Sequence, residues 1–111
     1  ISNGDCHFES YMKNAVLDAY QKEVEEIPDE IYEAANDGFT HKMGGYPGFT
    51  QYDPRNEEDS HDVLLFQLDS DFGDGADRIM WGDAGICNFF IHREKLKQCD
   101  FSDVIYNWDC C

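Results

Sequence analysis

The densest group of side chains able to do chemistry lies between residues 69 and 77, where four aspartates fall within nine residues. That many carboxylates in a short loop is typical of Ca²⁺ sites. An EF-hand loop that begins at Asp69 needs glycine at position six and glutamate at position twelve, but Asp74 and Met80 stand there. The segment is therefore predicted to be an acidic surface loop, because turns favour aspartate and glycine for backbone reasons alone.

Histidine and cysteine are the residues that bind Zn²⁺ in most protein sites. No pair of them here has the short spacing of a structural zinc site, so neither a metal ion nor another cofactor is predicted. Five cysteines without a Cys-x-x-Cys motif also indicate reduced thiols rather than a disulfide framework. The residues considered for zinc are His41, His61, His92, Cys99, Cys110 and Cys111.

Two further motifs have simpler structural explanations. Gly44-Gly45-x-Pro47 lacks the Lys-Ser/Thr pair of a phosphate-binding loop, so its glycines are expected to serve a turn. Asp83, in a Gly-Asp-Ala-Gly turn, is expected to bond the turn's own amide groups rather than to catalyse. No catalytic residue is predicted. An enzyme or ligand-binding domain stays open as an alternative, provided that carboxylates or a Cys-His pair converge in a pocket.

The charge balance is strongly acidic, with 24 Asp and Glu against 8 Lys and Arg and a net charge of -16. This excludes a nucleic-acid-binding module and argues against an anionic membrane surface as partner. Residues 53–77 hold nine acidic residues and one basic residue, whereas residues 78–98 hold two and four. We therefore expect an acidic face that docks a basic protein partner, with oligomeric state left open. Its expected residues are Asp53, Glu57, Glu58, Asp59, Asp69, Asp71, Asp74 and Asp77.

Another explanation for the acidity is adaptation to a high-salt cytoplasm, without a specific partner.

Hydrophobic residues make up 41% of the chain and aromatic residues 14%, too much for a disordered acidic tail. No stretch approaches the roughly eighteen apolar residues that span a bilayer, and the first residues lack the pattern of a signal peptide. The expectation is a soluble, folded protein.

The chain of 111 residues is predicted to form one domain, helical over residues 1–37, a long loop over 38–61 and a sheet over 62–111. Apolar residues from Phe8 to Tyr20 follow helical spacing, and Pro28 favours the start of a second helix that ends at 36–38. Rings at Phe39, Tyr46, Phe49 and Tyr52 are expected to pin the loop to the core.

Four strands are predicted, at residues 63–68, 79–81, 86–91 and 104–108, with one or two helical turns at 93–98. The run at 63–68 is typical of a central strand, and the glycines at 82 and 85 favour a hairpin between the second and third strands. Trp81, Phe89, Phe90 and Trp108 are expected in the core. The fold class is therefore α+β, with two N-terminal helices packed on a mainly antiparallel four-stranded sheet.

Several motifs over about residues 40–111 closely resemble the C-terminal part of the YwqG-like bacterial proteins. The motifs are Lys42–Arg55, Leu64–Asp71, Ile79–Gly85, Phe89–Ile91, Asp100–Ser102 and Trp108–Cys111. The resemblance implies a cytoplasmic bacterial protein of unknown function, related to proteins found among toxin and immunity genes, of which this chain looks like the C-terminal half. It brings no catalytic residues.

The Gly-Gly-x-Pro and Leu-Leu-x-Gln motifs are also weakly similar to programmed cell death protein two and its relatives, which act as chaperones for a basic ribosomal protein. The cysteine pairs that follow in those proteins are missing here. The similarity therefore does not imply metal binding. Together the two resemblances favour an immunity-type or chaperone-type binding protein.

Overall fold

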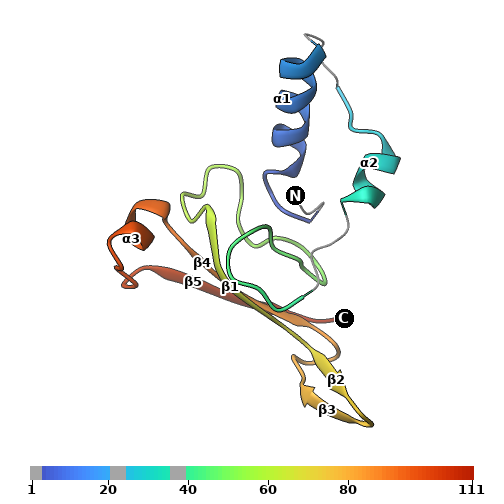
Figure 1. Ribbon diagram of the computed structural model, residues 1–111, viewed down its shortest axis with the longest axis vertical. Coiled ribbons are helices and arrows are strands. Elements are labelled where there is room, and N and C mark those ends of the chain that lie inside the picture. The colour runs from blue at the N-terminus through green and yellow to red at the C-terminus, as the bar shows by residue number, and fades with distance from the viewer. Residues whose placement is uncertain (1–3, 21–24, 36–39) are drawn as a thin grey trace.

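The computed structural model describes residues 4–20, 25–35 and 40–111. In this part the chain has three helices and five strands, in the order α1, α2, β1, β2, β3, β4, α3, β5 (Figure 1). The molecule is elongated and flat, with extents of 50 × 36 × 18 Å. The α+β class is confirmed. No helix in the described ranges is both long and apolar enough to cross a membrane.

The first two helices confirm the helical spacing of the N-terminal segment. Helix α1 spans Phe8–Tyr20 and α2 spans Asp29–Ala34, directly after Pro28. Phe8 is buried and packs against Tyr32 of α2, with ring centroids 4.7 Å apart. The predicted end of the second helix at 36–38 and the ring of Phe39 lie outside the described residues.

The main sheet has three antiparallel strands, not the predicted four, in the order β1-β4-β5. These are β1 (Val63–Asp69), β4 (Ile86–Ile91) and β5 (Val104–Asp109), and α3 (Arg93–Lys97) connects the last two. The predictions for these four segments are confirmed. The central strand, however, is β4, which is almost fully buried, whereas β1 lies beside it and is partly exposed.

The predicted hairpin between 79–81 and 86–91 is wrong. Instead β2 (Asp71–Gly73) pairs with β3 (Ala76–Ile79) as a separate two-stranded sheet. Both edges of β4 are already occupied by β1 and β5, so β3 has no edge of β4 to join. Ser70 fixes the turn between β3 and β4. Its hydroxyl donates to the Gly85 carbonyl at 2.7 Å and accepts from the Trp81 amide at 3.1 Å.

The layer over the sheet is the long loop, not the two helices that were predicted to pack there. Figure 1 places α1 and α2 beyond one end of the sheet, while the loop of residues 40–61 crosses it. Phe49 from the loop packs with Leu64 and Phe90 in the core. Gly48 is clamped to the sheet, because its amide donates to the Gln67 side chain at 2.8 Å and its carbonyl accepts from Asn88 at 3.0 Å.

Some aromatic side chains of the loop and the strands are buried in the core, and others are exposed on the surface. Phe49 and Phe90 are buried as predicted, but Tyr46, Tyr52 and Trp108 are exposed. Tyr46 and Tyr52 therefore do not pin the loop. Its attachment comes from Phe49, from the side chains of Gln67 and Asn88, and from backbone hydrogen bonds such as those that Lys42 and Gln67 exchange at 2.8 and 3.1 Å.

Candidate functional site

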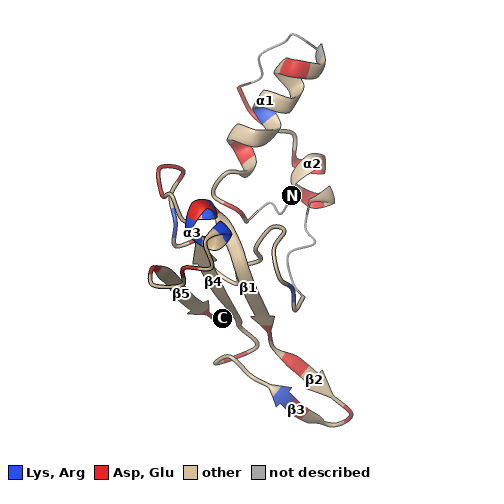
Figure 2. Ribbon diagram, turned by 60° about the vertical axis from the view of Figure 1, so that its left-hand side comes forward, with Lys and Arg blue, Asp and Glu red and all other residues tan. Residues whose placement is uncertain are grey.

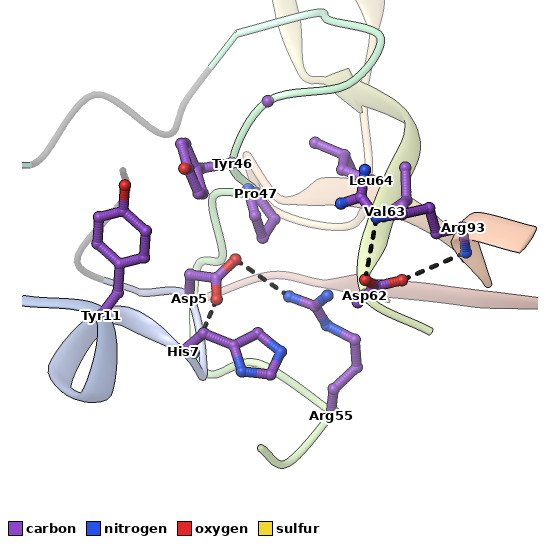
Figure 3. A pocket seen from close by; sticks show the side chains of 11 residues that line it. Asp5, His7, Tyr11, Tyr46, Pro47, Arg55, Asp62, Val63, Leu64 and Arg93 are labelled. Carbon is purple, nitrogen blue, oxygen red and sulfur yellow. Dashed lines mark hydrogen bonds and ion pairs between the residues drawn. The ribbon is translucent and has the colours of Figure 1, made fainter. Parts of the chain in front are cut away.

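A cavity of about 330 Å³ lies where the start of α1, the long loop and the start of β1 meet (Figure 3). Its walls come from segments that are far apart in the sequence. The chain therefore assembles this cavity only in the folded state. The residues that line it include Asp5, His7, Tyr11, Tyr46, Pro47, Arg55, Asp62, Leu64 and Arg93.

The floor of this cavity holds a buried ion-pair network around Arg55. The Arg55 side chain is 2% exposed and lies 2.8 Å from an Asp53 oxygen and 3.2 Å from an Asp5 oxygen, and both carboxylates are 6% exposed. The guanidinium also donates to the His61 carbonyl at 3.1 Å and stacks over the Phe90 ring at 3.9 Å.

This network has a structural role. Burial lowers the pKa of Arg55, but its hydrogen bonds to Asp53 and the charges of Asp53 and Asp5 outweigh burial and raise it. All three guanidinium nitrogens already donate to protein oxygens. Arg55 therefore ties the segment before α1, the loop and the sheet together, and is not poised to bind an anion in the cavity.

The carboxylates of the cavity do not support an acid-base pair. Asp5 is held by Arg55, and Asp62 is held by Arg93, whose Nε lies 3.5 Å from it. Each carboxylate of the cavity is thus paired with an arginine, and the two do not face each other as a pair. The arrangement thus gives the enzyme alternative no support at this cavity.

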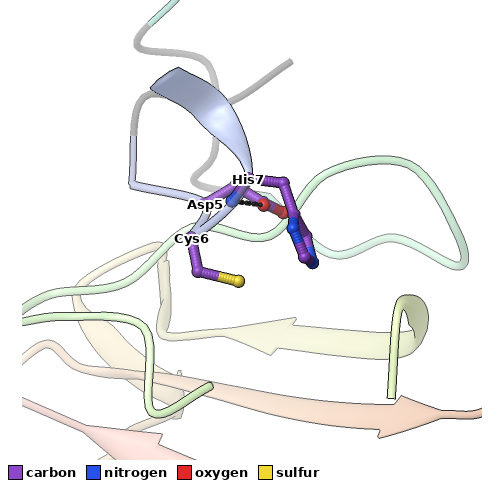
Figure 4. A group of neighbouring side chains, drawn as sticks. All are labelled: Asp5, Cys6 and His7. Atoms are coloured by element: carbon purple, nitrogen blue, oxygen red, sulfur yellow. Dashed lines mark hydrogen bonds between the residues drawn. The ribbon is translucent and has the colours of Figure 1, made fainter. Parts of the chain in front are cut away.

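Asp5, Cys6 and His7 are one of two groups in the described residues whose potential metal-ligating atoms lie within 4.8 Å of one another (Figure 4). The Asp5 carboxylate is engaged by Arg55 and by the His7 amide, which donates to it at 2.8 Å. Burial, with the nearby charge of Asp53, raises the pKa of the Cys6 thiol to about 12. The thiol is therefore a weak nucleophile and a weak ligand.

Selective alkylation should reveal this difference between the cysteines. Burial raises the pKa of Cys87 to about 11, so at pH 8 only about one thiol in a thousand there is thiolate, and still fewer at Cys6. In the native protein iodoacetamide should modify the exposed Cys99 and Cys111 and leave Cys6 and Cys87 unmodified. Peptide mass spectrometry checks this, with urea-unfolded protein as the control in which all five react. Equal rates at Cys6 and Cys99 would contradict the assignment.

The second group is formed by His61, His92 and Asp103. The Asp103 carboxylate lies 3.0 Å from His61 Nε2 and 2.8 Å from His92 Nε2. The two rings face each other with centroids 3.9 Å apart. His61 Nδ1 lies 2.8 Å from Asp59 Oδ1, and His92 Nδ1 lies 3.0 Å from the Ser60 carbonyl.

These contacts shift the pKa values of Asp59, His61 and Asp103. Hydrogen bonds from His61 and His92 lower the pKa of Asp103, and hydrogen bonds from the backbone and side chain of His61 lower the pKa of Asp59. Burial lowers the pKa of His61, but its bonds to Asp59 and Asp103 outweigh burial and raise it. The carboxylates of this cluster are therefore held in the charged form.

Strand register brings these three side chains together. Val63, Ile91 and Val104 are aligned across β1, β4 and β5, so His61, His92 and Asp103 lie at the same end of the sheet. The spacing rule for zinc sites missed the cluster because its members belong to three separate segments. Only the strand pairing carries this signal. Of the other residues considered for zinc, His41 lies elsewhere and its ring accepts the Asp69 amide at 3.0 Å.

The predicted acidic residues fall into two groups at opposite ends of β1. Residues 63–68 of β1 separate the groups, roughly 20 Å of strand at about 3.3 Å per residue. In the first group Asp53 is buried against Arg55 and Asp59 bonds His61, whereas Glu57 and Glu58 are exposed. In the second, on the β2–β3 hairpin and just before it, Asp74 and Asp77 are exposed and Asp69 and Asp71 are half-buried.

The turn residue Asp83 is exposed, and its neighbour Ala84 has a φ of 55° in the left-handed region. The two glycines of the Gly-Gly motif also have positive φ, 71° at Gly44 and 76° at Gly45, as expected for a turn. Both motifs thus form turns, but the contacts of the described residues include no hydrogen bond to the Asp83 carboxylate from the amides of its turn.

Comparison with known proteins places the chain in a family. No curated protein was found to match it. A family model described as "Domain of unknown function (DUF1963)" matches residues 1–110, through both the helical segment and the sheet. This description assigns no reaction, ligand or partner. The chain therefore belongs to the DUF1963 family.

Proposed function

We propose that this chain is an acidic binding protein that docks a basic protein partner through its β2–β3 hairpin. The observation that carries the proposal is the hairpin itself, whose strands pair with each other and with no other strand of the described residues, and which projects from the body of the molecule (Figure 2). Residues 69–78 carry four aspartates and one arginine. Their charge lies on a protruding element, where a partner can reach it.

The hairpin also carries an apolar anchor. Phe72 is 61% exposed and is flanked by the acidic residues of the hairpin. Arg78 lies 4.0 Å from Asp71, whereas Asp74 and Asp77 are exposed. An exposed ring among carboxylates matches a partner surface in which lysine or arginine surrounds an apolar pocket, since rings supply much of interface affinity and charges supply steering.

The other acidic group is less suited to a basic partner. Glu57 and Glu58 line a surface depression together with Arg93 and Lys95 of α3. These cations offset part of the negative charge there, as the mixed colours around α3 in Figure 2 illustrate. The hairpin therefore contributes the main acidic surface, and Glu57 and Glu58 contribute a secondary one.

An immunity-type or chaperone-type role and a bacterial, cytoplasmic setting belong to this proposal, because they rest on the resemblance of residues 40–111 to YwqG-like proteins. The weaker similarity to chaperones of a basic ribosomal protein supports the same kind of partner. In all these cases the acidic surface would shield or capture a cationic protein.

Charge reversal on the hairpin tests the proposal. The variant Asp71→Lys, Asp74→Lys, Asp77→Lys should bind an amphipathic peptide of alternating lysine and leucine at least about tenfold more weakly than the original chain at low salt. Raising the salt from about 50 to 200 mM should remove much of the original binding, because screening weakens exposed charge pairs. Fluorescence anisotropy of the labelled peptide measures both effects.

A matched control separates the hairpin from net charge. Glu25, Glu26 and Glu30 are exposed acidic residues near α2, and reversing them to lysine changes the net charge by the same amount. This control variant should keep affinity within about threefold. Equal losses in both variants would mean that the peptide responds to overall charge, and the hairpin proposal would be wrong.

A further inference from the structure

We propose that His61, His92 and Asp103 form a binding site for one divalent transition-metal ion, with Zn²⁺ the best match. The site is independent of the proposed docking hairpin, which lies at the other end of β1. Its three potential ligand atoms lie within 4.8 Å of one another. The inference depends on the number of hydrogen-bond donors that the two rings can provide.

All four ring nitrogens of the cluster face oxygens that only accept. His92 Nδ1 faces the Ser60 carbonyl at 3.0 Å and its Nε2 faces Asp103 at 2.8 Å. His61 likewise lies between two carboxylates, those of Asp59 and Asp103. A neutral imidazole has one N–H, so each ring leaves one nitrogen lone pair directed at an oxygen unless a second proton or a metal ion is present.

A metal ion satisfies this arrangement better than two extra protons. With a proton on every nitrogen, two positively charged rings would face each other with centroids 3.9 Å apart. One divalent cation bound by both Nε2 atoms leaves each ring neutral and replaces two protons at unchanged net charge. The carboxylates of Asp59 and Asp103 then balance the ion.

The remaining contacts match the surroundings of a metal-bound histidine. Histidine ligands usually donate the second ring N–H to a carboxylate or a backbone carbonyl, which fixes the tautomer. Here Asp59 would accept the Nδ1 proton of His61, and the Ser60 carbonyl would accept that of His92. Both acceptors come from the loop that precedes β1, so one short segment orients both rings.

The three side chains can reach one ion after Asp103 turns. His61 Nε2 lies 3.0 Å from Asp103 Oδ1 and His92 Nε2 lies 2.8 Å from Oδ2, whereas two ligand atoms of a tetrahedral site with bonds of about 2.0–2.1 Å lie about 3.3 Å apart. The Asp103 side chain is 49% exposed, so it is free to turn one oxygen toward an ion that both rings bind. Its exposure also leaves a solvent molecule room to complete the coordination.

The ligand set favours zinc over the alkaline-earth ions. Two imidazoles and one carboxylate suit Zn²⁺ and neighbouring transition metals, whereas Ca²⁺ and Mg²⁺ prefer oxygen ligands alone. His92 and Asp59 border the surface depression next to α3, which gives an ion a route from solvent. The strong negative charge of the chain, -16, also attracts cations to it.

Zinc titration of the full chain tests the site. The chain is first stripped with a chelator and carries Cys99→Ser, Cys110→Ser and Cys111→Ser, so that the exposed thiols and the half-buried Cys110 do not compete. Competition against a zinc-sensitive fluorescent chelator should give one Zn²⁺ per chain. His61→Gln, His92→Gln and Asp103→Asn should each lower zinc affinity at least about a hundredfold, and Asp59→Asn by about tenfold.

The control is His41→Gln, which removes an exposed imidazole outside the cluster and should leave affinity within about threefold. Asp103→Asn keeps the size of a half-exposed side chain, so it tests the site even if a histidine variant fails to fold. In ¹⁵N NMR, one equivalent of Zn²⁺ should shift Nε2 of His61 and His92 while each Nδ1 keeps its proton. Four ring N–H groups with added zinc, or unchanged affinity in Asp103→Asn, would overturn the proposal.

Discussion

Replacing Arg55 with alanine is expected to lower the free energy of unfolding by about 3–5 kcal/mol. The substitution leaves the carboxylates of Asp5 and Asp53 buried, each only 6% exposed, without the cation that balances them. It also removes the contact of the guanidinium with the Phe90 ring. The whole free energy of unfolding of a small domain is about 5–15 kcal/mol, so this loss is a large share of it. Urea denaturation followed by circular dichroism measures it.

Arg93→Ala is the matched control for Arg55. It removes the same charge, but the Arg93 side chain is 63% exposed and pairs with an Asp62 side chain that is 41% exposed. Exposed pairs contribute about 0–1 kcal/mol, so this variant should be nearly as stable as the original chain. Arg55→Lys should fall between them, because lysine keeps the charge and loses the forked geometry. Similar stability of Arg55→Ala and Arg93→Ala would show that the buried network contributes little.

Replacing Phe90 with alanine should cost a similar amount, about 3–5 kcal/mol. Phe90 is fully buried on the central strand and packs against Phe49 of the loop, with centroids 6.1 Å apart, and against Leu64. It also underlies the Arg55 guanidinium at 3.9 Å. Removing the ring therefore opens a cavity and weakens the attachment of the long loop to the sheet. The same denaturation experiment measures the effect.

Two further variants show which property of the Phe90 side chain stabilises the fold. Phe101 is 57% exposed, so Phe101→Ala should change stability by less than about 0.5 kcal/mol. Phe90→Leu keeps most of the apolar volume and loses the aromatic face, which isolates a cation–π contribution of up to about 2 kcal/mol. The losses in Phe90→Ala and Arg55→Ala should not add, because the two side chains touch. Strict additivity would contradict the contact.

Local sequence patterns were sufficient where a single segment carries the signal. The helical spacing from Phe8, the proline before α2 and the apolar runs of β1, β4 and β5 all correspond to elements of the structure. Each of these elements depends on the backbone geometry of neighbouring residues, which periodicity reports directly. The prediction that residues 79–81 pair with β4 is wrong, because an apolar run shows a tendency to pair and not the strand with which it pairs.

The roles of the acidic residues illustrate what local sequence patterns do not predict. In sequence, Asp53 and Asp74 are similar loop aspartates, yet Asp53 is buried against Arg55 and Asp74 is exposed on the hairpin. Arg55 stands two residues after Asp53, whereas glycines flank Asp74, but the sequence does not show that this arginine is buried with its carboxylate. Which carboxylates balance a buried charge depends on contacts such as that between Asp5 and Arg55, fifty positions apart.

The sequence by itself determined the strong negative charge, the α+β class and the position of most elements, because composition and local periodicity carry these properties. Tertiary structure alone decided that a loop covers the sheet, which carboxylates remain available to a partner and that two histidines meet Asp103. The antiparallel register of β1, β4 and β5 sets that meeting. Register arises from pairing between distant segments, and no local pattern contains it.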